Sequence, residues 1–149
     1  SQNCGAGQPG RVRKGMKEIY LYSVVVAVAA VLLMRVAAPW MVAFVSGSSE
    51  PIMLENGARY LLWNAPFYAV LGILLSTRYA LQSLGNKVLP LFSSVIELVG
   101  KVVFVVLFIP KFGYDAVILC EPIIWCVMAA YLVAVYRHDP FVFPKQEKR

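Results

Sequence analysis

The sequence predicts an all-α, polytopic membrane protein with four transmembrane helices. The composition, the length of four apolar runs and the placement of the charges support this prediction. Apolar residues make up 60% of the 149 residues and charged residues 15%, with a mean hydropathy of +0.68. Soluble domains have about 45–50% apolar and about 25% charged residues. The excess apolar surface must therefore face lipid.

Four apolar runs are long enough to cross a bilayer, which takes about 20 residues. They cover about residues 16–38, 58–84, 88–109 and 116–136. A short apolar piece, Trp40–Val45, follows Pro39 outside the first run. Because the runs are solidly apolar and do not alternate at every second residue, helices are favoured over the strands of a β-barrel.

Turns rich in Gly and Pro separate these runs and are expected to end the helices. They lie at residues 46–51, 85–87 and 110–115. Residues 1–15 are then a loop before the first helix. Residues 137–149 form a polar tail, which we expect to be loose.

The basic residues predict how the chain is oriented in the membrane. Nine of them flank one side of the predicted spans: Arg11, Arg13, Lys14, Lys17, Lys87, Arg137, Lys145, Lys148 and Arg149. Three flank the other side: Arg35, Arg59 and Lys111. The positive-inside rule therefore predicts a multi-pass protein of the plasma or inner membrane with both termini in the cytoplasm. The same placement explains the net charge of +6 without a nucleic-acid partner.

The residue types needed for common enzyme sites are scarce. The three cysteines, Cys4, Cys120 and Cys126, include no C-x-x-C pair, and His138 is the one histidine. A zinc site needs about four ligands. We therefore expect no enzyme, no catalytic residue, no metal site and no cofactor.

Two loops carry a more specific pattern. The first reads Gln2-Asn3-Cys4-Gly5-Ala6-Gly7 and is followed by a basic stretch. It resembles the cytoplasmic loop after the second helix of each lobe in multidrug and toxic compound extrusion (MATE) transporters, where a Gln-Asn-x-Gly-Ala-Gly run leads into the next helix.

The second loop reads Ala80-Leu81-Gln82-Ser83-Leu84-Gly85-Asn86. It is similar to the Ala-Leu-Arg-Gly-x-Gly-Asp pattern that ends the fourth helix of a lobe in the same family. Gln82, Ser83 and Asn86 stand where the family usually has Arg, Gly and Asp. Two predicted spans separate the loops, as in the family.

The resemblance implies a transporter of twelve helices in two six-helix lobes, in which this chain supplies helices nine to twelve. It implies a secondary antiporter that exports amphipathic or cationic drugs and toxic compounds in exchange for Na⁺ or H⁺. The partners would be the small organic substrate, the lipid bilayer and the rest of the transporter. A lipid-linked oligosaccharide flippase of the same superfamily and a non-transporting four-helix membrane subunit are the alternatives.

Four residues are candidates for a hinge or gate. Gly5 and Gly7 permit tight backbone turns near the lipid headgroups, and Gly85 lies in the turn between the second and third spans. Pro66 removes a backbone donor within the second span, which kinks a helix and frees a carbonyl. The alternatives are a topology anchor for the first loop and a packing kink at Pro66.

The polar residues within the spans are candidates for the transport pathway or for ion coupling. Glu97 and Lys101 are four residues apart on one helical face, in the favourable order for an ion pair. They form either a pathway stripe or a self-neutralised structural pair.

Asn64 and Tyr68 lie along one side of the second span, and Glu121 lies near the start of the fourth. Glu121 is either a favourable charge in the first helical turn or, if the helix begins near residue 116, a deeper carboxylate. Many MATE proteins carry an acidic residue for cation coupling in the helix that corresponds to residues 58–84. This chain has none there, so either Glu97 is an alternative carrier or the coupling carboxylates lie in the missing lobe.

Overall fold

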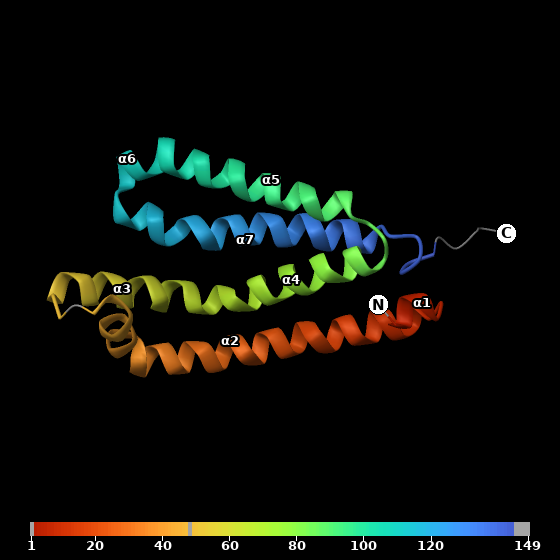
Figure 1. Ribbon diagram of the computed structural model, residues 1–149, viewed down its shortest axis with the longest axis horizontal. Coiled ribbons are helices and arrows are strands. Elements are labelled where there is room, and N and C mark those ends of the chain that lie inside the picture. Colours follow the sequence, from red (N-terminus) through yellow and green to blue (C-terminus); the bar gives the residue numbers. More distant parts are fainter. Residues whose placement is uncertain (1, 48, 145–149) are drawn as a thin grey trace.

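The computed structural model describes residues 2–47 and 49–144, and the secondary structure there is helical (Figure 1). The elements are α1 (Gln2–Gly5), α2 (Pro9–Ser46), α3 (Pro51–Asn64), a 3₁₀ turn (Ala65–Phe67), α4 (Tyr68–Ser83), α5 (Val88–Val103), a π-helical turn (Phe104–Phe108), α6 (Ile109–Phe112) and α7 (Tyr114–Arg137). They join into four helical units that are long and apolar enough to cross a membrane: Pro9–Ser46, Pro51–Ser83, Val88–Phe112 and Tyr114–Arg137. The predicted all-α fold class with four such helices is confirmed.

The four units lie side by side in a single layer (Figure 1). Helix α4 packs between α2 and α7, and α7 packs between α4 and α5. The order across the layer is therefore α2, α4, α7, α5. Helix α1 and the segment after α7 lie at the same end of the layer (Figure 1).

The helices are longer than the apolar runs suggested, and Pro39 does not end the first one. Helix α2 has 38 residues, contains Pro39 and ends at Gly47, whose φ of 63° and N–H bond to Ala43 O form a left-handed cap. Its length is about 57 Å at 1.5 Å per residue, well beyond the ~30 Å hydrocarbon core. Proline removes one hydrogen bond and bends the chain, yet a continued helix keeps the remaining backbone groups paired.

The predicted turn at residues 110–115 is present but shorter than expected. The third unit continues through Pro110 to Phe112, and Gly113 alone reverses the chain with φ 58° and ψ −134°. Pro110 lies in the first turn of α6, where its missing N–H costs little. The second unit likewise begins at Pro51, about two turns earlier than expected.

The layer leaves apolar side chains exposed on its faces. Val36 is 81% exposed, Phe44 90% and Val106 61%. Helix α7 is the most buried spanning unit, and α5 at the edge is the least buried. Apolar surface of this extent requires cover by lipid or by further helices.

A glycine sets the close approach of α2 and α4. A Cβ added at Gly72 would lie 2.6 Å from Ser23 Oγ and 2.7 Å from Ser23 Cβ. About one turn away, the Tyr20 hydroxyl donates to Thr77 Oγ1 at 2.6 Å, because Thr77 itself donates to Ile73 O. Small residues that let helix backbones approach are the usual means of packing in membranes, where the hydrophobic effect gives little help.

The tail is held in place over residues 138–144, so our expectation of a loose tail is wrong there. Asp139 accepts hydrogen bonds from Asn86 Nδ2 at 3.0 Å and from the N–H groups of Phe141 and Val142 at 3.0 and 3.3 Å. Val142 is fully buried. An Asp that bonds the backbone two residues on is a common turn former. Residues 145–149 lie outside the described residues.

Replacement of Gly72 by Ala should weaken the packing of α2 against α4. The added methyl group overlaps Ser23, and overpacking of this kind costs about 1–3 kcal/mol. Thermal unfolding of the purified protein in nanodiscs should show the loss. Gly10→Ala is the matched control, since Gly10 lies in α2 with nothing within 4 Å of an added Cβ. Equal melting temperatures for the two variants would contradict the prediction.

Candidate functional site

A group of three charged side chains joins α5 to α7. Lys101 Nζ donates to Glu97 Oε1 at 2.9 Å and lies 3.2 Å from Glu121 Oε1. Glu97 and Lys101 are one turn apart on α5, as their spacing predicted. Glu121 reaches the same ammonium group from α7. We call Glu97, Lys101 and Glu121 the charged triad.

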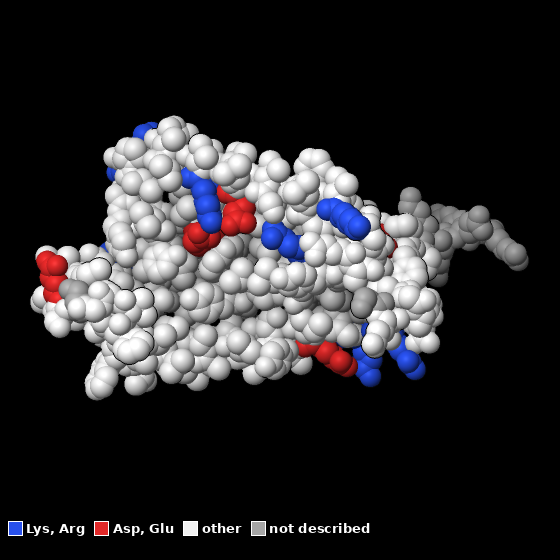
Figure 2. Space-filling model, viewed as in Figure 1, with Lys and Arg blue, Asp and Glu red and all other residues white. Residues whose placement is uncertain are grey.

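The charged triad lies well inside the helical units that are long enough to span a membrane. Glu97 is about 14 Å from the start of its unit at Val88 and about 22 Å from its end at Phe112, at 1.5 Å per residue. Figure 2 shows acidic and basic side chains in contact with one another on the α5 side of the layer. Ionisable groups at such a depth are costly and mark functional sites in membrane proteins.

The fourth helix begins early enough to make Glu121 a deep residue. Helix α7 starts at Tyr114, so Glu121 lies about 10 Å along it. The interpretation of Glu121 as a first-turn charge is therefore wrong, and Pro122 lies inside the helix instead of at its start. The early start follows from the single-residue turn at Gly113.

Close contact between α5 and α7 brings the triad together. A Cβ added at Gly100 would lie 3.0 Å from Ile124 Cγ1, so the two backbones approach each other next to Lys101. A larger residue at position 100 would push α5 away from α7. The small residue beside the lysine thus allows its ammonium group to reach a carboxylate on the neighbouring helix.

The charged triad carries one more negative than positive charge. Two carboxylates share one ammonium group, and their side chains remain 35% exposed at Glu97 and 26% exposed at Glu121, with Lys101 at 43%. In a medium of low dielectric constant an unmatched charge is unfavourable unless a counter-charge approaches. The group is therefore suited to bind a proton, a metal cation or an organic cation from its open side.

Asn64 and Tyr68 contact the stretch of α7 that carries Glu121. Asn64 Nδ2 donates to Tyr60 O at 2.9 Å and to Ile118 O at 3.3 Å. The rings of Tyr68 and Trp125 pack with centroids 6.2 Å apart. Residues three before and four after Glu121 lie within about 60° of it around a helix. The two candidates therefore meet α7 on nearly the face that holds the triad.

Asn64 has an unused hydrogen-bond acceptor. Its side chain is 1% exposed, and its Oδ1 atom is buried without a partner among the described residues. The 3₁₀ turn Ala65–Phe67 follows directly and contains Pro66, which supplies no N–H to the carbonyl one turn earlier. A break in a spanning helix next to an unpaired amide oxygen offers oxygen ligands at the level of the membrane.

Arg78 on α4 is bound to the neighbouring helix α5. Its Nη2 atom donates to Ser93 Oγ on α5 at 2.7 Å. Ser93 is fully buried and donates in turn to Pro90 O. This bond links α4 to α5 near the Gly85 turn.

Among the glycine candidates for a gate, two adopt the left-handed conformation. Gly7 has φ 65° and Gly85 has φ 89°, values that strain other residues. Gly5 is the last residue of α1 and has no positive φ, so the expected tight turn at Gly5 is wrong. The chain turns at Gly7 because a short helix precedes it.

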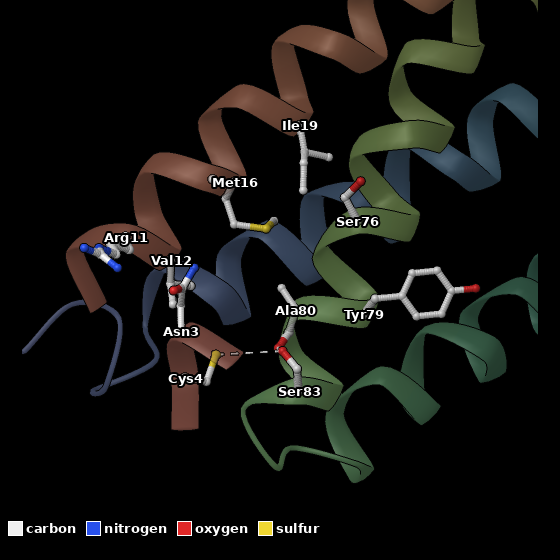
Figure 3. A pocket seen from close by; sticks show the side chains of 11 residues that line it. Asn3, Cys4, Arg11, Val12, Met16, Ile19, Ser76, Tyr79, Ala80 and Ser83 are labelled. Atoms are coloured by element: carbon white, nitrogen blue, oxygen red, sulfur yellow. Dashed lines mark hydrogen bonds between the residues drawn. The ribbon is translucent and has the colours of Figure 1, made fainter. Parts of the chain in front are cut away.

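The two loops that carry the sequence motifs lie against each other. Cys4 Sγ lies 3.9 Å from Ser83 Oγ, and both line a pocket of about 510 Å³ between α1, α2 and α4 (Figure 3). Met16 and Tyr79 line other parts of the same pocket (Figure 3). Motifs far apart in the sequence thus form one structural unit at the end of the layer opposite α6.

A sequence model of the MatE family matches residues 1–107, which covers both loops and the helices through most of the π-helical turn. The chain belongs to the MatE family. MatE proteins are membrane transporters, and four apolar helices make this chain a multi-pass membrane protein. No curated protein and no solved structure is similar enough to the chain to count as a match.

The MatE match includes Glu97 and Lys101 but ends before Glu121. Sequence reasoning found the pair on α5 but missed the bond from Lys101 to α7. The spacing of Gly113 and Glu121 was the signal that could have predicted this bond. A helix that starts directly after Gly113 places Glu121 about two turns inside that helix. Within the described residues, no three His, Cys, Asp or Glu side chains converge as metal ligands do.

Loss of the lysine should harm this MatE chain more than loss of one carboxylate. Lys101→Met leaves two unmatched carboxylates, whereas Glu97→Gln leaves Lys101 paired with Glu121. We expect Lys101→Met to cost about 2–3 kcal/mol, below the ~3–5 kcal/mol of a fully buried pair because the side chains are partly exposed. Glu97→Gln should cost about 1 kcal/mol or less.

Thermal unfolding of the transporter in nanodiscs measures both losses. The variant Glu97→Gln/Lys101→Met should remain destabilised, because Glu121 stays unmatched. Addition of Glu121→Gln to that double variant should restore most of the stability. If the double variant alone recovers the wild-type melting temperature, Glu121 is not a partner of Lys101.

Proposed function

We propose that the chain is the C-terminal part of a secondary antiporter that exports amphipathic or cationic organic compounds in exchange for Na⁺ or H⁺. The observation that carries this proposal is the charged triad, a site of net charge −1 inside spanning helices. The other helices of the transporter, the bilayer and the organic substrate are its partners.

The unmatched charge of the triad gives a physical basis for exchange. A proton or Na⁺ that enters neutralises the surplus carboxylate, and an organic cation would do the same. The two cations then compete for one negative charge, so inward movement of the ion displaces the exported compound. Differential binding of this kind is what alternating-access transport requires.

Asn64, Tyr68 and the Pro66 turn extend the proposed pathway along α3 and α4. The unpaired Oδ1 atom of Asn64 supplies an oxygen ligand, and the ring of Tyr68 supplies an aromatic surface for an organic cation. Pro66, together with Gly7 and Gly85 in the loops, supplies points where the chain bends as the transporter rocks. We retain these residues as pathway and hinge candidates.

The arrangement favours a drug exporter over a lipid-linked oligosaccharide flippase. A flippase must bind phosphates, which calls for free cations in the cavity. Lys101 is instead shared by two carboxylates, and the group repels an anion. A four-helix subunit without transport activity would have no need for an unmatched charge at this depth.

We propose further that both termini are cytoplasmic, as the excess of basic residues at the α1 end of the layer indicates. Single cysteines at Ser49 and Lys111 should then react with an impermeant thiol reagent from outside, and one at Lys87 only after the membrane is opened. Cys4, Cys120 and Cys126 must first be replaced. Reaction of the position-49 cysteine only from the cytoplasmic side would reverse the orientation.

Removal of the carboxylates tests the exchange site. Glu121→Gln and Glu97→Gln should leave the transporter folded, since Lys101 keeps one partner in each. Each should lower ion-driven efflux of an ethidium-type dye at least about tenfold, because one carboxylate and Lys101 form a neutral pair with no charge left to exchange. The measurement is dye efflux from proteoliposomes under an imposed Na⁺ or H⁺ gradient.

Glu55→Gln is the matched control for these variants. Glu55 is an exposed carboxylate on α3 that lies outside the triad, so its loss should leave efflux unchanged. Wild-type efflux in both triad variants, at equal amounts of folded protein, would refute the proposal. Efflux lost equally in Glu55→Gln would point to a general loss of charge instead.

A further inference from the structure

A second charged site, separate from the charged triad, lies at the end of the layer that holds α1 and the segment after α7. A pocket of about 620 Å³ opens between the first turns of α2, the last turns of α7 and the segment after α7. Its basic residues are Arg13, Lys14, Lys17 and Arg137, and its aromatic residues are Tyr20, Tyr136 and Phe143. In Figure 2 basic side chains gather at the end of the molecule where α2 begins. We call this the basic pocket.

The positive charges of the basic pocket are poorly matched by the protein. Lys14 lies 3.9 Å from Glu18, and both side chains are mainly exposed, so this pair contributes little. In the described parts of the chain, Arg13, Lys17 and Arg137 have no carboxylate within ion-pair distance. Asp139 lies nearby but is engaged with Asn86 and the tail backbone. Among the described residues, three of the four cations around this cavity thus have no carboxylate partner, and the fourth has only a weak, exposed one.

Aromatic side chains form part of the wall of the basic pocket. The guanidinium of Arg13 lies over the Phe143 ring at 5.6 Å, and Phe143 packs edge-on against Tyr136 with centroids 6.0 Å apart. Tyr136 is 5% exposed, and its hydroxyl has no hydrogen-bond partner in the described residues. These contacts hold the tail over the pocket and fix the position of Arg13. The cavity therefore combines cationic donors with an apolar lining.

The position of the basic pocket relative to the membrane indicates which class of anion it binds. Arg137 ends α7, and Arg13 and Lys17 lie in the first turns of α2, a helix that exceeds the hydrocarbon thickness by about 27 Å. The ends of spanning helices, where these basic residues lie, are at the level of the lipid headgroups. Basic pockets at helix ends on the cytoplasmic side are suited to the phosphate of anionic lipids.

We propose that the basic pocket binds the phosphate-bearing headgroup of an anionic phospholipid such as phosphatidylglycerol. The phosphate lies among Arg13, Lys17 and Arg137, and the acyl chains leave along the apolar sides of α2 and α7. The lipid links two helices that have little direct contact with each other, since α4 packs between them. Its binding stabilises this end of the layer. The proposal does not depend on the transported substrate.

Thermal unfolding of the purified transporter in detergent tests the proposal. Added phosphatidylglycerol should raise the melting temperature of the wild type, and phosphatidylcholine should not. In Arg13→Gln/Arg137→Gln the lipid concentration for half of the effect should rise about tenfold or more, because each basic residue near an anionic headgroup contributes to affinity. Lys111→Gln is the matched control, since Lys111 lies at the other end of the layer and should keep the wild-type response.

Three results would overturn the proposal. One is an unchanged response to phosphatidylglycerol in the double variant, and another is an equal response to phosphatidylcholine. The third is an equal stabilisation by glycerol phosphate or inorganic phosphate, which would make the pocket a site for a free anion.

If the double variant does not fold, Lys17→Gln replaces it, because Lys17 is exposed and has no ion pair in the described residues. Native mass spectrometry of the wild type, with retained phosphatidylglycerol expected over phosphatidylcholine, gives a reading without any variant.

Discussion

Hydrocarbon offers no hydrogen-bond partner, and a chain that crosses it must pair its polar groups internally. The helices of this protein follow that constraint through residues that would end a helix in water. Helix α2 continues through Pro39, α7 continues through Pro122, and the third unit passes Pro110 with a π-helical turn before it. The side chains obey the same constraint. Tyr20 donates to Thr77, Arg78 to Ser93, and Lys101 is shared by two carboxylates.

The constraint also explains which predictions from the sequence succeeded. Four spans followed from composition and run length, because lipid demands long apolar helices whatever their partners. The bounds failed where the sequence offered Gly and Pro as stops, at Pro39 and at residues 110–113. In water such residues mark helix ends, but in lipid an early end would leave backbone groups unpaired. The loose tail failed for another reason, since Asp139 bonds to Asn86 across 53 positions of sequence.

The sequence predicted the part of the charged triad that lies on one helix, but not the contact between helices. Glu97 and Lys101 are neighbours on one helix, and spacing alone places them together. The bond from Lys101 to Glu121 depends on how closely α5 approaches α7, which Gly100 and Ile124 decide. No local pattern specifies that distance. The two loop motifs, in contrast, identified the family, and the structure shows them in contact through Cys4 and Ser83.

The charged triad has a consequence for the energy source of any cation that reaches it. A net charge inside the hydrocarbon lies within the electric field of an energised membrane. The work of moving one elementary charge across the whole field is about 2.3 kcal/mol per 100 mV. A cation that arrives at Glu121 or Glu97 crosses only part of that field, and the membrane potential contributes the corresponding part of this work. In the exchange proposed above, where the ion enters from outside, occupancy of the triad would depend on voltage as well as on concentration, and loss of the membrane potential at constant ion concentrations would lower that occupancy.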